Sequence, residues 1–455
     1  MSLPNRRLSV CRRPYVFAAL FAAITGMPAR GRAQGTADDG PAPADDDGDQ
    51  SAGIVLDNAA FEQRLAQSEA LVRNSQPTVQ VGGYVDFGFF VPQGNGAGYI
   101  EDFGHVFVPR YAGQFGWVFL GDILAPAVNT RGEPADLGPA PGVNRYDSVN
   151  SRGAPGFIVN EVNVVLRSAL TPTALVTASL NFTPRTGNDF ALGDVFDVDI
   201  AQVEWLPTAS QRTSIFVGKM DPVFGIEYRD RKSDRRFGIT PSLMARYTIG
   251  PALGVKLRTK FGSGDWLVLA VAFTNGSNTV EQFHFYDEID SNLGKTGSGR
   301  LALRLPLSIE IGASGSAGPQ DRSTDTGGWM WFYGFDLLAH WGPVELKGQW
   351  MKGHAPGEPS QGVYGLDLHQ GGYLELDAML TSSLGVLGRG GFRDALVWLG
   401  DQRAYLTKSW RATVGLRWVL TSRAVFKAEY LKNVEYGGLP YVPNDVFTTS
   451  LVMGF

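Results

Sequence analysis

The chain has 455 residues, and its 45 acidic and 40 basic side chains give a formal net charge of −5. This balance argues against nucleic-acid binding, which requires a surplus of basic side chains. The single cysteine, Cys11, excludes internal disulfides and cysteine-based metal sites. No segment contains 18 consecutive apolar residues, so the sequence predicts no transmembrane helix.

Residues 1–33 have the pattern of a secretory signal peptide. Four arginines precede an apolar run from Tyr15 to Ile24, and Gly31-Arg32-Ala33 offers small residues for cleavage after Ala33. Cys11 lies before this apolar run, whereas a lipoprotein cysteine would follow it. Cleavage would remove six basic residues and no acidic ones, leaving a net charge of about −11.

The next two segments separate the signal from the folded domain. Residues 34–53 are rich in Pro, Gly, Ala and Asp and predict an acidic disordered linker. Residues 54–76 predict a short periplasmic helix, with Phe61, Leu65 and Val72 on one side. Three roles for this helix stay open: a periplasmic plug, a trimerising coil or a plain spacer.

From residue 78 to residue 455, short and long connections alternate between segments with period-two apolar patterns. The short connections are 171–172, 207–211, 262–265, Leu307, 342–343, 382–383 and 421–423. The long ones are 92–155, 184–196, 221–252, 277–297, 316–327, 354–370, 392–408 and 434–445. Outer-membrane β-barrels have this pattern, with short periplasmic turns, long extracellular loops and an even number of strands.

The requirement for an even number of strands then decides how the segment around 242–249 is interpreted. If it crossed the membrane, every later connection would change sides, and the long stretch after Gly276 would become a periplasmic turn. Residues 221–252 are therefore predicted to be one extracellular loop. The fold class is all-β: a transmembrane antiparallel barrel of about sixteen strands, range roughly 14 to 18. The predicted strands are 79–91, 156–169, 173–183, 197–206, 213–220, 253–261, 266–276, 298–306, 308–315, 328–341, 344–353, 371–381, 384–391, 409–420, 424–433 and 446–455.

Alternation within the predicted strands assigns one face to lipid and the other to water. In 409–420, Trp410, Val414 and Trp418 share the apolar face, while Arg411 and Arg417 lie on the opposite one. In 328–341 the apolar face carries aromatic residues near both ends, as expected at the two membrane interfaces. The final strand places Phe447, Thr449, Leu451, Met453 and Phe455 on one face, and Phe455 is its last residue.

Basic residues gather on the predicted inner face and in one loop. Strand 253–261 turns three bases inward and 298–306 turns two inward. Within 227–236, five bases and three acids form the densest charge cluster of the mature chain. The candidate pore-lining or constriction residues are Arg229, Arg231, Lys232, Arg235, Arg236, Lys256, Arg258, Lys260, Arg300 and Arg304. Side chains of one charge sign that line a pore favour the passage of ions of the opposite sign, so these bases favour anions.

Two points weigh against a simple anion channel. One alternative is that the acids Glu345, Glu375, Asp377 and Glu429 face part of the basic ladder and create a transverse field instead. Loop 221–252 also has two interpretations: a constriction inside the lumen or a solvated extracellular loop. Both alternatives stay open at this stage.

The architecture, the opening strand Gly82-Gly83-Tyr84-Val85-Asp86-Phe87 and the terminal Phe455 resemble the sixteen-stranded porins of Gram-negative bacteria. Among these, the chain is remotely similar to phosphate-selective porins of the O/P type. The resemblance implies a water-filled channel in the cell outer membrane for passive diffusion of small hydrophilic solutes. It also implies a third extracellular loop, here 221–252, folded into the lumen, and recognition of Phe455 by the barrel assembly machinery.

The resemblance names no solute. The expected partners are outer-membrane lipid and lipopolysaccharide, the assembly machinery and small hydrophilic solutes or anions, and a homotrimer is one candidate assembly. A non-conducting structural or surface-interaction barrel is the alternative function, and an outer-membrane enzyme is a further one. No catalytic residue, metal or cofactor is expected, because the histidines are scattered along the sequence. They are His105, His284, His340, His354 and His369.

Overall fold

The computed structural model describes residues 79–92, 155–182, 196–208, 210–276, 294–320, 328–357, 365–399, 402–435 and 445–455. The predicted signal peptide, linker and periplasmic helix (1–33, 34–53 and 54–76) lie outside these ranges, as do His105 and His284. Parts of most predicted long loops also lie outside them, whereas loop 221–252 is described throughout.

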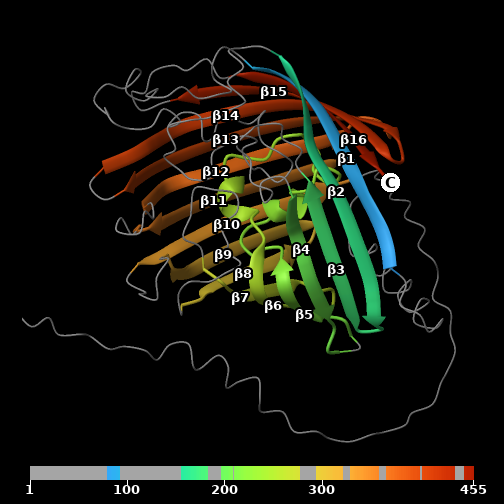
Figure 1. Ribbon diagram of the computed structural model, residues 1–455, viewed down its shortest axis with the longest axis vertical. Helices are drawn as coiled ribbons and strands as arrows, with labels where there is room; N and C mark the ends of the chain where they lie inside the picture. The colour runs from blue at the N-terminus through green and yellow to red at the C-terminus, as the bar shows by residue number, and fades with distance from the viewer. Residues whose placement is uncertain are drawn as a thin grey trace, which may run out of the picture. The chain divides into compact units, whose positions relative to one another are not determined.

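The described chain forms β-strands in the order that the sequence predicts (Figure 1). They are β1 (Val79–Pro92), β2 (Gly156–Thr171), β3 (Ala174–Phe182), β4 (Phe196–Trp205), β5 (Thr213–Met220), β6 (Ala252–Phe261), β7 (Leu267–Thr274), β8 (Thr296–Leu305), β9 (Ile309–Pro319), β10 (Trp329–Trp341), β11 (Val344–Ala355), β12 (Gly365–Met379), β13 (Leu384–Leu399), β14 (Gln402–Thr421), β15 (Ala424–Glu435) and β16 (Val446–Gly454). Two single-turn helices, η4 (Glu227–Asp230) and α5 (Ala245–Thr248), lie between β5 and β6.

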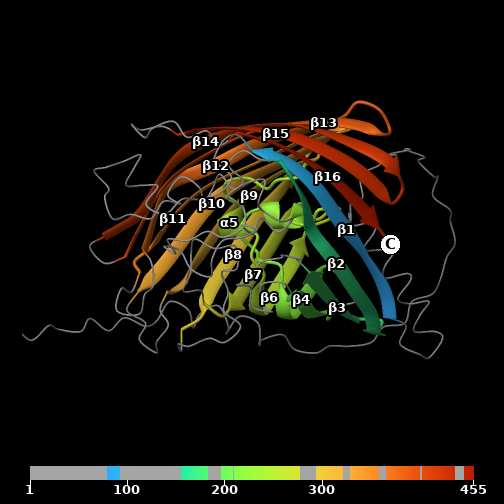
Figure 2. The same cartoon turned by 45° about the horizontal axis from the view of Figure 1, so that its top comes forward.

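The strands close into one antiparallel barrel. Each pairs with its neighbours in the chain, and β1 pairs with β16, which ends the series without a free edge. Phe455 belongs to this seam, because its N–H donates to the carbonyl of Gly83 and its own carbonyl accepts from the Gly83 N–H. Figure 2 shows β1, β2 and β16 side by side at the seam. The prediction of a sixteen-stranded barrel is confirmed.

The parity argument also holds in detail. Residues 242–249 contain the helical turn α5 and no crossing strand, so 221–252 is one connection between β5 and β6. Pro222 follows β5 and Pro251 precedes β6, and neither residue has the N–H that a continued ladder needs. Within the described part of the chain, no helix is long and apolar enough to cross a membrane.

The strand ends differ most from prediction in β12, β13 and β14. β12 starts at Gly365 instead of residue 371, β13 continues to Leu399 instead of 391, and β14 starts at Gln402 instead of 409. The predicted long loop 392–408 is therefore mostly a strand hairpin. Sequence alternation reports the lipid boundary, and hydrogen bonding between strands continues beyond it, where no apolar face is required.

The outer face of the wall is apolar, as the alternation predicts. On β14, Trp410, Val414 and Trp418 are exposed, while Arg411 and Arg417 of the same strand are buried on the inner side. On β10, Phe335 is 57% exposed and its inward neighbour Asp336 is 6% exposed. Exposed apolar outer faces with charged inner ones are the arrangement of a transmembrane barrel.

Candidate functional site

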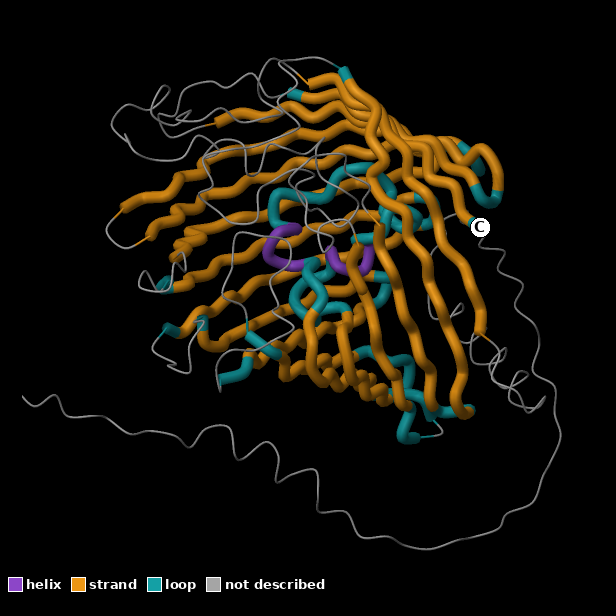
Figure 3. The backbone as a smooth tube through the Cα atoms, viewed as in Figure 1, coloured by secondary structure: helices purple, strands orange, loops and turns teal. Residues whose placement is uncertain are grey.

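Loop 221–252 lies inside the barrel. Figure 3 shows its teal turns and purple helices η4 and α5 surrounded by the strands. Every residue of the loop whose burial is described is buried or half-buried. Gly225 has a φ of +69°, and a Cβ there would overlap the Gln349 side chain, so glycine permits the close approach of the loop to β11. The solvated extracellular loop, one of the two interpretations of the sequence, does not fit this placement.

Apolar side chains give the loop a small core of its own. Tyr228 packs against Ala245 and Ile249, and Tyr247 stacks on Phe332 of β10 with ring centroids 5.9 Å apart. The other buried apolar residues of the loop include Val223, Phe224, Ile226, Ile239, Leu243 and Met244. The loop is therefore a compact folded segment.

The first part of the loop, 221–232, binds the wall through its charged side chains. Arg231 forms an ion pair with Asp199 of β4 at 2.5 Å and with Asp221 at 2.7 Å. Lys232 lies 2.5 Å from a carboxylate oxygen of the same Asp199, and Arg229 lies 2.8 Å from Glu310 of β9. In one further pair the base is on the wall and the acid is on the loop: Lys347 of β11 lies 3.0 Å from Asp230.

Charge pairing keeps Arg231 and Asp221 of this first part ionised. Burial by itself would lower the pKa of Arg231, but the carboxylates of Asp199 and Asp221 outweigh burial and raise it well above its ordinary value. Burial would likewise raise the pKa of Asp221, yet Arg231 and Lys256 bring it below its ordinary value. The contact between Arg231 and Asp221 is therefore an ion pair at neutral pH.

The second part, 233–241, is held through its main chain. The Lys427 ammonium group on β15 donates to the carbonyls of Ser233, Arg236 and Gly238 at 2.7, 2.6 and 2.8 Å. Arg417 of β14 donates to the carbonyl of Arg236 at 3.0 Å.

Glu429 and Arg389 complete this set of contacts. The Glu429 carboxylate of β15 accepts from the main-chain N–H groups of Ile239 and Thr240 at 2.6 and 3.0 Å. Arg389 of β13 donates to the Thr240 carbonyl at 2.8 Å. Side chains of three strands thus satisfy main-chain groups that a loop cannot pair within itself.

The predicted inner bases on the strands do face inward, and most contact acids. Arg300 lies 2.5 Å from Asp336 and 2.8 Å from Glu310, and Arg304 lies 3.2 Å from Glu310. The β6 bases pair more loosely: Arg258 with Glu204 at 3.7 Å and Lys260 with Asp265 at 3.4 Å, while Lys256 donates to the main-chain carbonyl of Asp221 at 2.8 Å. Such pairing weakens the field that the bases present to a passing ion.

Arg235 and Arg236 complete the set of predicted loop bases. Arg235 is half-buried. Arg236 is 4% exposed, and its three guanidinium nitrogens have no hydrogen-bond partner among the described residues. Burial lowers the pKa of Arg236 below its ordinary value, although Glu429 opposes the shift. A buried guanidinium without a partner is unfavourable.

Sequence reasoning missed the residues that hold the second part of the loop. The alternation places Arg417 on the inner face, but it does not predict that Arg417 donates to a loop carbonyl. It likewise does not predict the roles of Lys427 and Arg389. Of the acids expected to oppose the bases, Glu375 pairs with Lys347 at 2.9 Å and with Arg389 at 2.9 Å. The alternation of 424–433 was the available signal, since it places Lys427 and Glu429 on the inner face.

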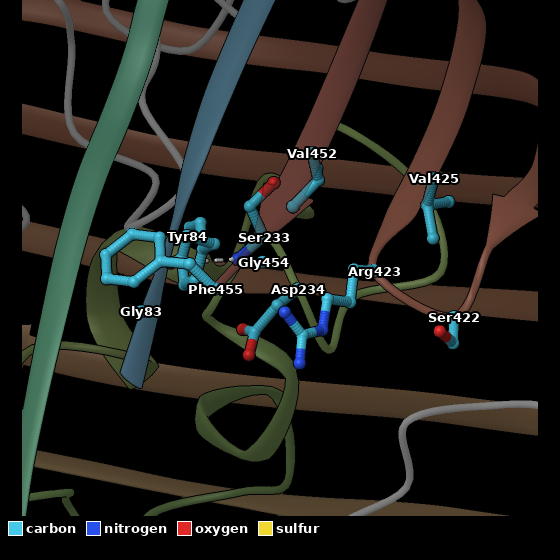
Figure 4. Close-up of a pocket in the computed structure, with 10 residues that line it drawn as sticks. All are labelled: Gly83, Tyr84, Ser233, Asp234, Ser422, Arg423, Val425, Val452, Gly454 and Phe455. Atoms are coloured by element: carbon cyan, nitrogen blue, oxygen red, sulfur yellow. Dashed lines mark hydrogen bonds between the residues drawn. The ribbon is translucent and has the colours of Figure 1, made fainter. Parts of the chain in front are cut away.

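A cavity of ≈ 250 Å³ opens beside the β1–β16 seam, near the short turn between β14 and β15 (Figure 4). The loop residues Ser233 and Asp234, the turn residue Arg423 and the terminal Phe455 line it. Ser233 also bonds to Asp86 through its hydroxyl, and its N–H donates to the Tyr84 hydroxyl at 3.3 Å. The loop therefore begins at the end of β5 that lies opposite its short turn, and it extends through the barrel to the end of β15 that a short turn joins to β14.

Neither a protein-family model nor a curated protein matches the sequence. Among solved structures, the outer membrane channel DcaP of Acinetobacter baumannii is 9% identical over 84% of this chain and 98% of its own, with a TM-score of 0.48. An anion-selective porin from Comamonas acidovorans is 12% identical over 84% and 100%, with a TM-score of 0.48. OmpT of Vibrio cholerae, in a trimer form, is 9% identical over 83% and 99%, with a TM-score of 0.47.

Proposed function

We propose that this barrel is an outer-membrane channel for passive diffusion of small hydrophilic solutes. The observation that carries the proposal is a closed barrel of sixteen strands, apolar outside and charged inside, with a folded loop in its lumen. Barrels of sixteen to eighteen strands are wide enough to enclose an aqueous channel, whereas eight-stranded ones are filled by side chains. Loop 221–252 narrows that channel.

Planar-bilayer recording tests the proposal. Purified protein should add discrete conductance steps. Folded, inserted protein that adds no step even after residues 223–250 are replaced by a short hairpin would favour the non-conducting structural or surface-interaction barrel. An outer-membrane enzyme is the weaker alternative. Among the described residues, His340 lies beside Glu345, while His354 and His369 both lie beside Asp367, and all three histidine side chains are 36% exposed or more.

We further propose a modest anion preference, based on two buried bases, Arg236 and Arg417. Arg417 donates to the main-chain carbonyl of Arg236, and no carboxylate of the described residues lies within ion-pair distance of it. The guanidinium of Arg236 has no hydrogen-bond partner among the described residues. Charge without a neutralising partner attracts anions more strongly than the paired bases of β6.

Reversal potentials in a salt gradient test this preference. Arg236→Gln should shift the potential toward cation preference, while Arg258→Gln, which removes a base paired with Glu204, should shift it less. Equal shifts in the two variants would remove the basis for assigning the preference to the buried bases. The difference between them should shrink at high salt, where charges are screened.

Phe455 is proposed as the assembly signal. It ends the exposed stripe of β16, is 59% exposed and closes the seam with Gly83. Deleting Phe455 should reduce outer-membrane insertion and the heat-modifiable folded band on gels. Met453→Ala, on the same exposed stripe of β16 but not at its end, is the control, and equal insertion of both variants would refute the role. A homotrimer and contact with lipopolysaccharide complete the proposed setting, and chemical crosslinking of intact cells tests the trimer.

A further inference from the structure

Three anchoring contacts of the loop lie near the ends of the strands that short turns connect, whereas Asp199 and Phe332 are each the fourth residue from the long-loop ends of β4 and β10. Glu310 is the second residue of β9, Lys347 the fourth of β11 and Lys427 the fourth of β15. These contacts place much of the loop in the half of the barrel next to those turns, which is the periplasmic half in barrels of this class. The cavity in Figure 4 lies at the same end.

The contacts also surround the lumen. Hydrogen bonds or ion pairs join the loop to β1, β2, β4, β6, β9, β11, β13, β14 and β15. Tyr247 adds a ring contact with Phe332 of β10, and Met244 packs against Gly371 of β12. A loop that narrows a pore from one side would contact one part of the wall. This loop contacts opposite sides of the barrel.

Burial agrees with that distribution. A wide aqueous passage beside the loop would leave whole side chains exposed to solvent, yet no loop residue with described burial is classed as exposed. The side chains of Asp221, Arg229 and Asp230 are 34% to 36% exposed, so water reaches only part of each. The residues at its centre are charged or large and fill space between the walls; Arg231 is 3% exposed and Met244 is 0% exposed.

We infer that loop 221–252 is a plug that closes the periplasmic half of the lumen to solutes, and that solutes pass only when the loop leaves part of the wall. This inference rests on the proposed channel function and adds its regulation. The structure is the closed state.

The bonds that hold the plug suit reversible release. They are mainly ion pairs and hydrogen bonds, whose partners water can replace. Release would also bring the guanidinium of Arg236, which lacks a partner among the described residues, into contact with water. Segment 233–241, which is held by Lys427, Glu429, Arg417 and Arg389, is therefore the part expected to detach first.

Excision of the loop tests the plug directly. Met220 and Ala252 pair across β5 and β6, so a short Gly/Ser hairpin can replace residues 223–250 without separating the strands. The protein without the loop (the excised protein) should show a several-fold larger single-channel conductance than the intact protein. Liposomes containing it should swell in neutral sugars that the intact protein excludes. Heat modifiability on gels verifies that the excised barrel is folded.

A second variant keeps the whole loop. Lys427→Met with Glu429→Gln removes the main-chain contacts of 233–241 and should produce frequent openings to the larger conductance. Lys432→Met, whose side chain is 42% exposed, is the matched control and should leave the record unchanged.

The outcomes separate the plug from the channel function. If the intact protein conducts and passes sugars as well as the excised one, the plug is refuted and the channel function stands. If the excised barrel is folded and inserted but does not conduct, the channel function fails. If large conductance appears only after the loop is excised or after the Lys427→Met/Glu429→Gln substitution, the result supports both the plug and the channel function.

Discussion

Residues 221–232 and residues 233–241 belong to one loop, but the barrel holds the first mostly with acids and the second mostly with bases. In the first part, the loop's own Arg229, Arg231 and Lys232 reach carboxylates on β2, β4 and β9. In the second part, Lys427 and Arg417 reach the loop's carbonyls, and Glu429 receives two of its N–H groups.

The difference shows that side-chain charge and main-chain polarity impose separate requirements on the wall. A charged segment buried in the lumen requires opposite charges on the wall, because an unpaired buried charge is costly. An irregular main chain requires donors and acceptors whatever its side chains are, because its N–H and carbonyl groups cannot pair within the segment.

Loss of Asp199 should have the largest effect on the loop. Its buried carboxylate pairs with both Arg231 and Lys232, so Asp199→Asn leaves two buried cations with fewer partners and should lower the free energy of unfolding by about 4 kcal/mol. Urea unfolding in lipid vesicles and trypsin cleavage within the loop measure the loss. Asp265→Asn, at a half-exposed turn pair with Arg212, should cost less than about 1 kcal/mol.

Lys427→Met should have the next largest effect. The substitution removes three donors and leaves the carbonyls of Ser233, Arg236 and Gly238 without them, but it also removes a buried charge, so we expect a loss of about 2 kcal/mol. Cleavage should begin in 233–241 and not in 221–232. Cleavage that begins in both parts together would mean that the loop detaches as one unit. Lys432→Met is the exposed control.

Acid should loosen the first part by a smaller amount. Although burial opposes it, the pairing with Arg231 and Lys256 lowers the pKa of Asp221, so this carboxylate stabilises the fold above the ordinary aspartate pKa of about 3.9. The contribution is lost as the pH falls through the folded-state pKa. The protection factors of amides in peptides from 221–232, corrected for the intrinsic pH dependence of hydrogen exchange, should therefore fall below pH of about 4, and Asp221→Asn should flatten this dependence. A flat profile in the unsubstituted protein would contradict this account.

Arg236→Met should have the smallest effect. Its main-chain carbonyl still accepts from Lys427 and Arg417, while its guanidinium, without a partner among the described residues, is removed. We expect stability within about 1 kcal/mol of the unsubstituted protein, or slightly above it. A loss as large as that of Asp199→Asn would show that the guanidinium bonds to a group outside the described residues.

The sequence by itself determined the strand count, the face of each strand and the inward direction of the β6 and β8 bases. These features depend on a period of two along a single strand and on the alternation of connection lengths. Lys256 is 9% exposed while Val255 beside it is 46% exposed, as the alternation of 253–261 requires. A pattern of this kind is local, so it can be read without knowing any neighbouring strand.

Only the tertiary structure decided what the loop contacts. Lys427 lies 189 to 194 positions along the chain from the three carbonyls that it binds, and Asp199 lies 32 positions from Arg231. The sequence cluster 227–236 showed a high density of charge but not which charges would be neutralised. Barrel closure determines those partners, because it brings β4, β9 and β15 around one lumen. The main-chain partners could not be predicted either, since every residue has the same N–H and carbonyl groups whatever its side chain.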